Sequence, residues 1–177
     1  INYNHFLFYL FPTSVVILII RFINYLVQGY YGFSLGLTLN WEPTFFAGNN
    51  VFLRSYIQRI IGTDITGRLY QTRIEEAYGW GATSKWHTMY LWFANDFGFI
   101  GVIIIMFLIG YVLGQSLYDG LENKNPYGLC LSYLLIKTIL YSSANNQILG
   151  TYSIVTVIIL YIMWKKKKIV FKFGRHN

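Results

Sequence analysis

Apolar residues gather in four long stretches that are nearly free of charge. Residues 97–117 and 148–164 carry no charged side chain, residues 127–141 contain only Lys137, and residues 6–27 contain only Arg21. A helix needs about 20 apolar residues, within a range of about 17 to 25, to cross the hydrocarbon core of a bilayer. These stretches predict four membrane-spanning helices. The expected fold class is all-α, a polytopic transmembrane helical bundle forming a single integral membrane domain over residues 1–177.

Charge at the end of the chain predicts its orientation. Four lysines occupy residues 165–168, and Lys172 and Arg175 follow them. Because the cytoplasmic flanks of membrane helices are enriched in lysine and arginine, residues 165–177 are expected to be a cytoplasmic basic tail. Each span reverses the side of the membrane. The connection 142–147 is then outside, the connection 118–126 inside, and residues from about 28 to 92 form one large external loop.

Composition agrees with an integral membrane protein. Hydrophobic residues make up 55% of the chain and charged residues 12%, about half the charge of an ordinary soluble domain. The net charge of +7 is spread over the tail, the loop and two apolar stretches rather than gathered in one stripe, which argues against nucleic-acid binding. Cys130 is the single cysteine, so no intramolecular disulfide forms. The chain begins at Ile1 rather than Met and is expected to be the C-terminal part of a longer protein.

The external loop is expected to be folded, because connections of this length are usually functional or disordered and this one is rich in aromatic residues. Leu53, Tyr56, Ile57 and Ile60 recur at helical spacing, which predicts a short amphipathic helix. Such a helix either lies flat on the membrane surface or plugs the outer face of the bundle.

Cations in the loop suggest an anionic ligand. Arginine donates a planar fork of hydrogen bonds that matches phosphate, and it stays charged at any working pH. The alternative is contact with ordinary lipid head groups or with Asp64, Glu75 and Glu76. The candidate substrate-binding cations are Arg54, Arg59, Arg68, Arg73 and Lys85.

Aromatic residues crowd the end of the loop. They suit anchors at the membrane interface, and a groove that stacks on sugar rings is the second interpretation. His87 lies among them, either as a structural residue or as a general base near neutral pH. The aromatic residues are Tyr78, Trp80, Trp86, Tyr90 and Trp92.

Asn95 and Asp96 precede the stretch 97–117 and occupy the position of a helix N-cap. Asp96 is also a candidate to hold an arginine or to take a proton. Arg21 is close enough to the outer end of its span to extend to the interface, whereas Lys137 is less easily explained in this way. Two spacings of small residues favour close approach of helices: Gly32 with Gly36, and Gly110 with Gly114.

Several motifs of cofactor chemistry are absent from the sequence. It contains no Asp-x-Asp pair, no His/Cys cluster with metal spacing, no Walker loop and no Gly-x-Ser-x-Gly elbow. A metal-dependent sugar-nucleotide transferase and a nucleotide-driven pump are therefore disfavoured, and we expect no metal and no cofactor.

Three short motifs carry a resemblance to a known family. Residues 29–35 read Gly-Tyr-Tyr-Gly-Phe-Ser-Leu, residues 48 and 49 are Gly-Asn, and residues 95–101 read Asn-Asp-Phe-Gly-Phe-Ile-Gly. From about residue 25 to its end the chain resembles the C-terminal half of Wzy-type O-antigen polymerases, the bacterial oligosaccharide repeat-unit polymerases. The resemblance implies a multi-pass protein of the bacterial inner membrane that builds O-antigen or capsular polysaccharide on its outer face.

The implied reaction transfers a growing glycan from undecaprenyl pyrophosphate to a new lipid-linked repeat unit. The implied partners are this lipid-linked oligosaccharide, the bilayer, a chain-length regulator and a flippase. Pyrophosphate departure suits the five cations as substrate-binding residues, without a metal. Trp86 is the further substrate-binding candidate, as an aromatic face that stacks on a sugar ring. The candidate catalytic residues are His87, Asp96 and Glu75, with Glu76 a further candidate base. An O-antigen ligase and, in a different class, a non-enzymatic polysaccharide flippase or transporter are the alternative functions.

Overall fold

The computed structural model describes residues 11–145 and 151–166, except for the side chains of residues 151 and 152. Parts of four predictions lie outside these residues: residues 6–10 of the first span, residues 146 and 147 of the last connection, residues 148–150 of the last span, and the basic tail from residue 167 onward. Within the described ranges every regular element is a helix, which confirms the all-α prediction.

Six helices follow one another along the described chain. They are α2 (Thr13–Gly36), α3 (Val51–Ile61), α4 (Tyr70–Tyr78), α5 (Met89–Glu122), α6 (Pro126–Leu140) and α7 (Thr151–Lys166). The helices α2, α5, α6 and α7 correspond to the predicted spans, and α3 and α4 lie in the predicted external loop. This loop is shorter at both ends than predicted. It covers residues 37–88 rather than 28–92, because the helical pattern continues through the last turns of α2 and the first turns of α5.

Two described helices, α2 and α5, are long and apolar enough to cross a membrane. Only 11% of the most apolar window in each is buried within the protein, so most of their apolar surface faces outward. Over its described residues α6 has 15 positions and α7 has 16. At 1.5 Å per residue these helices measure about 22 to 24 Å, less than a hydrocarbon core of about 30 Å. Length and composition therefore support two of the four predicted spans.

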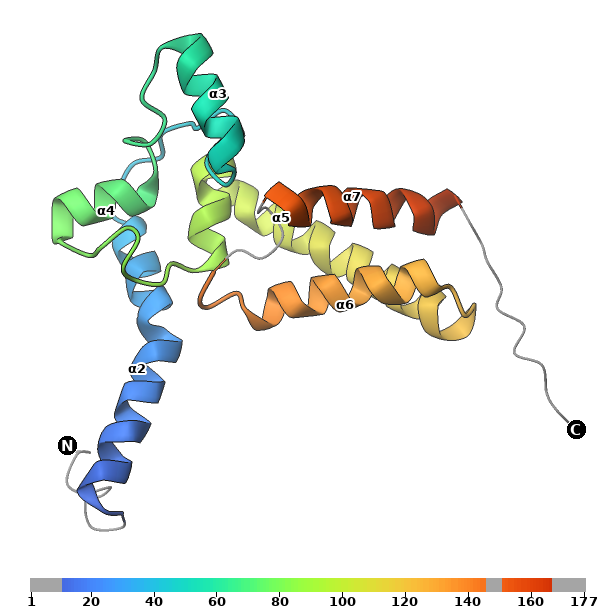
Figure 1. Ribbon diagram of the computed structural model, residues 1–177, viewed down its shortest axis with the longest axis horizontal. Helices are drawn as coiled ribbons and strands as arrows, with labels where there is room; N and C mark the ends of the chain where they lie inside the picture. The colour runs from blue at the N-terminus through green and yellow to red at the C-terminus, as the bar shows by residue number, and fades with distance from the viewer. Residues whose placement is uncertain (1–10, 146–150, 167–177) are drawn as a thin grey trace, which may run out of the picture.

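The helices α5, α6 and α7 lie side by side, while α2 runs away from them (Figure 1). The last turns of α2 join the others: the ring of Phe33 lies 5.6 Å from that of Phe99 and 6.1 Å from that of Tyr90. A Cβ atom at Gly36 would lie only 2.4 Å from Leu91 Cδ1, so glycine permits this approach. The expected bundle is thus a layer of three helices to which α2 attaches by one end.

The larger cluster of buried apolar residues lies where α4 and the first half of α5 meet. Tyr70 and Ile74 of α4 pack there with Met89, Leu91 and Phe93 of α5. A second cluster joins α6 to α7 through Leu131, Leu135 and Trp164. The first cluster holds the connection 37–88 against the helical layer and so positions the polar residues described below.

Gly98 interrupts α5. Its φ of 64° and ψ of 171° lie in a region that is essentially restricted to glycine. The predicted helix start at residue 97 is therefore an interior break of a longer helix that begins at Met89. Thr88 is its N-cap and accepts a hydrogen bond from the backbone N–H of Leu91. The prediction that Asn95 and Asp96 cap a helix is wrong for α5, because residues 89–94 are already helical.

The glycine spacings gave one correct and one wrong prediction of close approach. Gly36 contacts α5, and a Cβ atom at Gly32 would lie 3.0 Å from both Trp80 Nε1 and His87 Nδ1. A Cβ atom at Gly110 or Gly114, by contrast, would meet no described atom within 4 Å. The second pair lies on an outward face of α5.

The predicted amphipathic helix is present as α3. Asn50 caps it by accepting a hydrogen bond from Leu53 N, and Gly62 ends it in the left-handed conformation. None of its residues is buried. Phe52, Tyr56 and Ile60 are exposed, so α3 does not plug the helical layer. Its exposed apolar side chains instead suit a helix that lies on a membrane surface.

Candidate functional site

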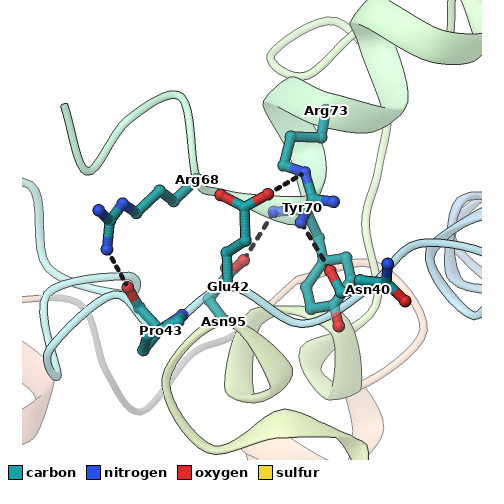
Figure 2. A network of polar contacts seen from close by, with 7 residues as sticks. All are labelled: Asn40, Glu42, Pro43, Arg68, Tyr70, Arg73 and Asn95. Atoms are coloured by element: carbon teal, nitrogen blue, oxygen red, sulfur yellow. Dashed lines mark hydrogen bonds and ion pairs between the residues drawn. The ribbon is translucent and has the colours of Figure 1, made fainter.

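Three of the predicted substrate-binding arginines hold the backbone of the segment 40–48. Figure 2 shows Arg68 Nη1 donating to Pro43 O at 3.3 Å and Arg73 Nη1 donating to Asn40 O at 2.7 Å. Arg73 Nε also pairs with Glu42 at 3.3 Å. The carboxylate partner is thus Glu42, which the sequence analysis did not name. Arg68 and Arg73 thus stabilise the fold of the connection between α2 and α5.

Arg54 Nη1 reaches the other end of this segment and donates to Gly48 O at 3.4 Å. Burial lowers the pKa of the Arg54 guanidinium, and the nearby Asp96 carboxylate acts in the opposite direction. Arg59 is exposed on α3 and forms no hydrogen bond or ion pair with the described residues. The structure therefore distributes the four arginines around the loop rather than gathering them at one site.

Asp96, a predicted catalytic residue, organises the same segment. Its Oδ1 accepts hydrogen bonds from the Thr44 hydroxyl and, at 2.8 Å, from Gly48 N. Its Oδ2 accepts from Asn49 Nδ2 at 2.7 Å. Asn49 Nδ2 also lies 2.8 Å from Trp92 O. Asp96 therefore fastens residues 44–49 to α5, near Arg54.

Asn95 is fully buried and links α5 to α4. Its Oδ1 accepts from Tyr70 N at 2.8 Å, and its Nδ2 donates to Gln71 Oε1 at 3.1 Å. Tyr70 is the first residue of α4, whose opening N–H groups have no partner within the helix. Asn95 therefore supplies the hydrogen-bond acceptor that the first N–H group of α4 needs. Because Gly98 breaks α5, the carbonyl of Asn95 is also available, and it accepts from Trp41 Nε1 and Thr44 Oγ1.

Lys85, Trp86 and His87 lie together at a hollow of about 410 Å³, which we call the tryptophan hollow. The backbone bond from Met89 N to Ser142 O, at 2.8 Å, joins its two sides. All three are candidate site residues from the sequence, whereas the part that the connection after α6 plays in the hollow was not predicted. It is lined by residues 82–87, Trp92, Ala144 and Asn145.

His87 is only 2% exposed, and neither of its ring nitrogens opens into the hollow. Its Nε2 lies 3.2 Å from Gly81 O, and since a carbonyl only accepts, this nitrogen carries the proton. The other nitrogen, Nδ1, is buried and has no hydrogen-bond partner among the described residues, and the same holds for Trp80 Nε1. Burial lowers the pKa of His87, which keeps the ring neutral at neutral pH. This geometry favours the structural interpretation of His87 over direct catalysis.

Glu75 is exposed on α4, close to the edge of the tryptophan hollow. A Cβ atom at Gly81, which precedes the lining residue Ala82, would lie 3.7 Å from Glu75 Oε1. The Glu75 carboxylate also acts to raise the pKa of His87, against the larger effect of burial. The structure thus brings together two of the three predicted catalytic residues, His87 and Glu75, and places Asp96 in a separate network.

A second hollow, of about 610 Å³, shares Lys85 with the first, and we call it the Arg21 groove. On one side lie Trp80 and Lys85, whose Nζ is 5.2 Å from the Trp80 ring centroid. The other side is a face of α2. Arg21, predicted only to extend to the interface, shares helical spacing with Asn24 and Gln28, and all three line the groove. The lining residues are Arg21, Asn24, Tyr25, Val27, Gln28, Tyr31, Trp80 and Lys85.

Among the described residues no group of three or more His, Cys, Asp or Glu side chains is placed to hold a metal ion. Comparisons of the chain with protein-family models, curated proteins and solved structures find no match.

Proposed function

We propose that this chain is the C-terminal part of a Wzy-type polymerase of lipid-linked oligosaccharide repeat units. The reaction transfers a growing glycan from undecaprenyl pyrophosphate to the non-reducing-end sugar of a new lipid-linked unit, on the outer face of the bacterial inner membrane. A bond forms between the anomeric carbon and the acceptor oxygen. The bond from that carbon to the pyrophosphate breaks, the lipid pyrophosphate departs, and the acceptor proton moves to a base.

The observation that carries the proposal is that the three motifs of the family resemblance meet in space. Gly48 and Asn49 donate hydrogen bonds to Asp96, which joins the second motif to the third. Phe33 of the first motif packs against Phe99 of the third, with ring centroids 5.6 Å apart. Segments far apart in the sequence thus form one structural unit. Trp92 connects this unit to the tryptophan hollow, because its carbonyl accepts a hydrogen bond from Asn49 and the residue also lines the hollow.

The tryptophan hollow is assigned to the acceptor sugar. Its volume of about 410 Å³ falls in the range of about 300 to 1,000 Å³ found for small-molecule sites. Trp86 and Trp92 offer aromatic faces to sugar rings, and Ser84 supplies a hydroxyl beside them. Lys85 stands between this hollow and the Arg21 groove, where its charge stabilises the negative charge that develops on the departing pyrophosphate.

Glu75 is assigned the role of proton acceptor. It is exposed near Gly81, and it forms no hydrogen bond with the described part of the chain, so its carboxylate is available to an incoming hydroxyl. His87 is a positioning residue: it holds the turn at Gly81 through Nε2 while its ring stays neutral. Arg54, Arg68 and Arg73 support the site by holding the segment 40–48.

A glycan ladder gel from cells lacking this gene, complemented with the full-length protein or its variants, tests the proposal. Loss of the ladder with one repeat unit still attached to the lipid A core is expected for a polymerase. Loss of all surface glycan with lipid-linked polymer accumulating outside would indicate a ligase. Lipid-linked single units trapped inside would indicate a flippase. Either of the last two results contradicts the proposal.

The same gel tests the role of Glu75. Glu75→Gln removes the base and keeps the side-chain shape, so it is expected to abolish the ladder while the protein remains in the membrane at the normal level. Glu76→Gln, on the neighbouring exposed carboxylate of α4, is the matched control and is expected to keep the ladder. Equal loss in both variants would mean that the charge of α4 matters and that Glu75 is not the base.

A further inference from the structure

The described residues that line the Arg21 groove include two cations and no acidic side chain. Arg21 is exposed and forms no hydrogen bond or ion pair with the described residues. Lys85 lies over the Trp80 ring, 5.2 Å from its centroid, and likewise has no carboxylate partner there. The groove therefore has an unneutralised charge of two, which is complementary to an anion.

The polar residues of the groove follow one face of an otherwise apolar helix. Arg21, Asn24 and Gln28 are separated by three and four positions, so they project from the same side of α2. Phe22, Ile23 and Leu26, on other faces, are exposed. Polar and ionisable residues on a membrane helix are costly unless they face a cavity or a partner, and they commonly mark a functional site.

Aromatic residues place the groove at the level of lipid head groups. The Tyr31 and Trp80 rings meet edge to face at 4.8 Å, and the Tyr25 and Trp86 rings do so at 5.8 Å. Tyrosine and tryptophan concentrate at the boundary between hydrocarbon and water. A ligand in this position can present an anionic head group to the two cations while its chains follow the exposed apolar faces of α2.

We infer that the Arg21 groove binds the phosphate-bearing head group of an anionic lipid, with Arg21 and Lys85 as its two charged contacts and the amides of Asn24 and Gln28 as further hydrogen-bonding groups. Two sources supply this chemistry: an anionic phospholipid of the bilayer and a polyprenyl pyrophosphate. The inference concerns binding alone, so it holds or fails separately from the proposed polymerase reaction.

Lipid binding to the purified full chain tests the inference. Native mass spectrometry in detergent would measure affinity for three probes: phosphatidylglycerol, zwitterionic phosphatidylcholine and farnesyl pyrophosphate. Because each basic residue near an anionic lipid surface contributes about 1 kcal/mol, Arg21→Gln and Lys85→Gln should each weaken anionic-probe binding about fivefold, and the double variant about thirtyfold. Lys124→Gln removes an exposed cation at the turn between α5 and α6 and should change nothing.

The outcomes separate the two sources. Tighter binding of phosphatidylglycerol than of farnesyl pyrophosphate, lost in the double variant, supports the inference with a bilayer lipid as the ligand. The reverse preference, also lost in the double variant, supports it with a lipid pyrophosphate as the ligand. Equal binding by the double variant and the wild type overturns it, as does phosphatidylcholine binding as tightly as the anionic probes. Arg21→Glu, which repels an anion, checks that reduced binding comes from charge.

Discussion

Replacement of Asn95 by leucine should open the start of α4 without unfolding the helical layer. Leucine has the same branched arrangement of non-hydrogen atoms but neither accepts nor donates a hydrogen bond. Tyr70 N and Gln71 Oε1 both lose their Asn95 partners, and both residues are almost fully buried. A buried polar group without a partner costs about 1–3 kcal/mol. The two losses together lower the local opening free energy of α4 by about 2–6 kcal/mol.

Hydrogen exchange of peptides covering residues 70–78 measures this opening directly. Since about 1.4 kcal/mol corresponds to a factor of ten, the smaller loss already predicts exchange about thirtyfold faster than in the wild type. The exchange rate of residues 70–78 in Asn95→Asp should lie between the rates of the wild type and of Asn95→Leu. The aspartate still accepts from Tyr70 N, and rotation of the Gln71 amide would give its Nε2, which lacks a partner in the wild type, a carboxylate to donate to.

The control is Asn123→Leu, the same substitution at an exposed position at the end of α5. Its hydrogen bond to Asp119 is distant from α4 in the chain and solvent-exposed, so exchange in residues 70–78 should stay unchanged. Exchange in Asn95→Leu within about threefold of the wild type would refute the reasoning, because the predicted minimum is about thirtyfold. It would mean that Asn95 does not stabilise the start of α4.

Four further outcomes are expected. Gly98→Ala forces a side chain into a glycine-only conformation and should destabilise the protein by about 1–3 kcal/mol, measured by thermal unfolding in detergent. Gly29→Ala places a Cβ atom 1.9 Å from Ser143 O and should lower the melting temperature, whereas the Cβ atom of Gly110→Ala meets no described atom within 4 Å, so this substitution should be neutral or stabilising. His87 has a lowered pKa, so the unfolded chain binds its proton more readily; stability should fall as the pH drops below about 6.5, and less so in His87→Gln. A reporter enzyme fused to the C-terminus should be active only when it is a cytoplasmic reporter, and periplasmic activity would contradict the predicted orientation.

The predictable part of the fold is the location of its helices. Apolar stretches with one charge at most predicted α2, α5, α6 and α7. The spacing of Leu53, Tyr56, Ile57 and Ile60 predicted α3, because helix formation depends on local pattern. Boundaries were less accurate. Asn95 and Asp96 have the residue types of an N-cap, and no local signal revealed that the helix had begun at Met89. Residue type alone does not say which helix a capping side chain serves.

Part of the candidate site was also predictable. Trp86, His87 and Lys85 are neighbours in sequence and remain neighbours at the tryptophan hollow. The arginines show the limit of this reasoning. Their type suggested phosphate, but Arg68 and Arg73 lie next to the backbone of Pro43 and Asn40, some 25 and 33 positions away. Contacts over such separations depend on how the loop folds back on itself.

The sequence by itself determined that this protein is helical and that α2 and α5 have the length and apolar character to cross a membrane, because these properties depend on residues that lie close together in the chain. Only the tertiary structure decided that Asn95 stabilises α4, that Asp96 holds residues 44–49, and that Arg21 and Lys85 face one groove. Gly32 and Gly36 let the last turns of α2 approach the loop and α5, and Gly98 changes the direction of α5. These contacts join residues far apart in the sequence, so a local pattern of residues does not contain them.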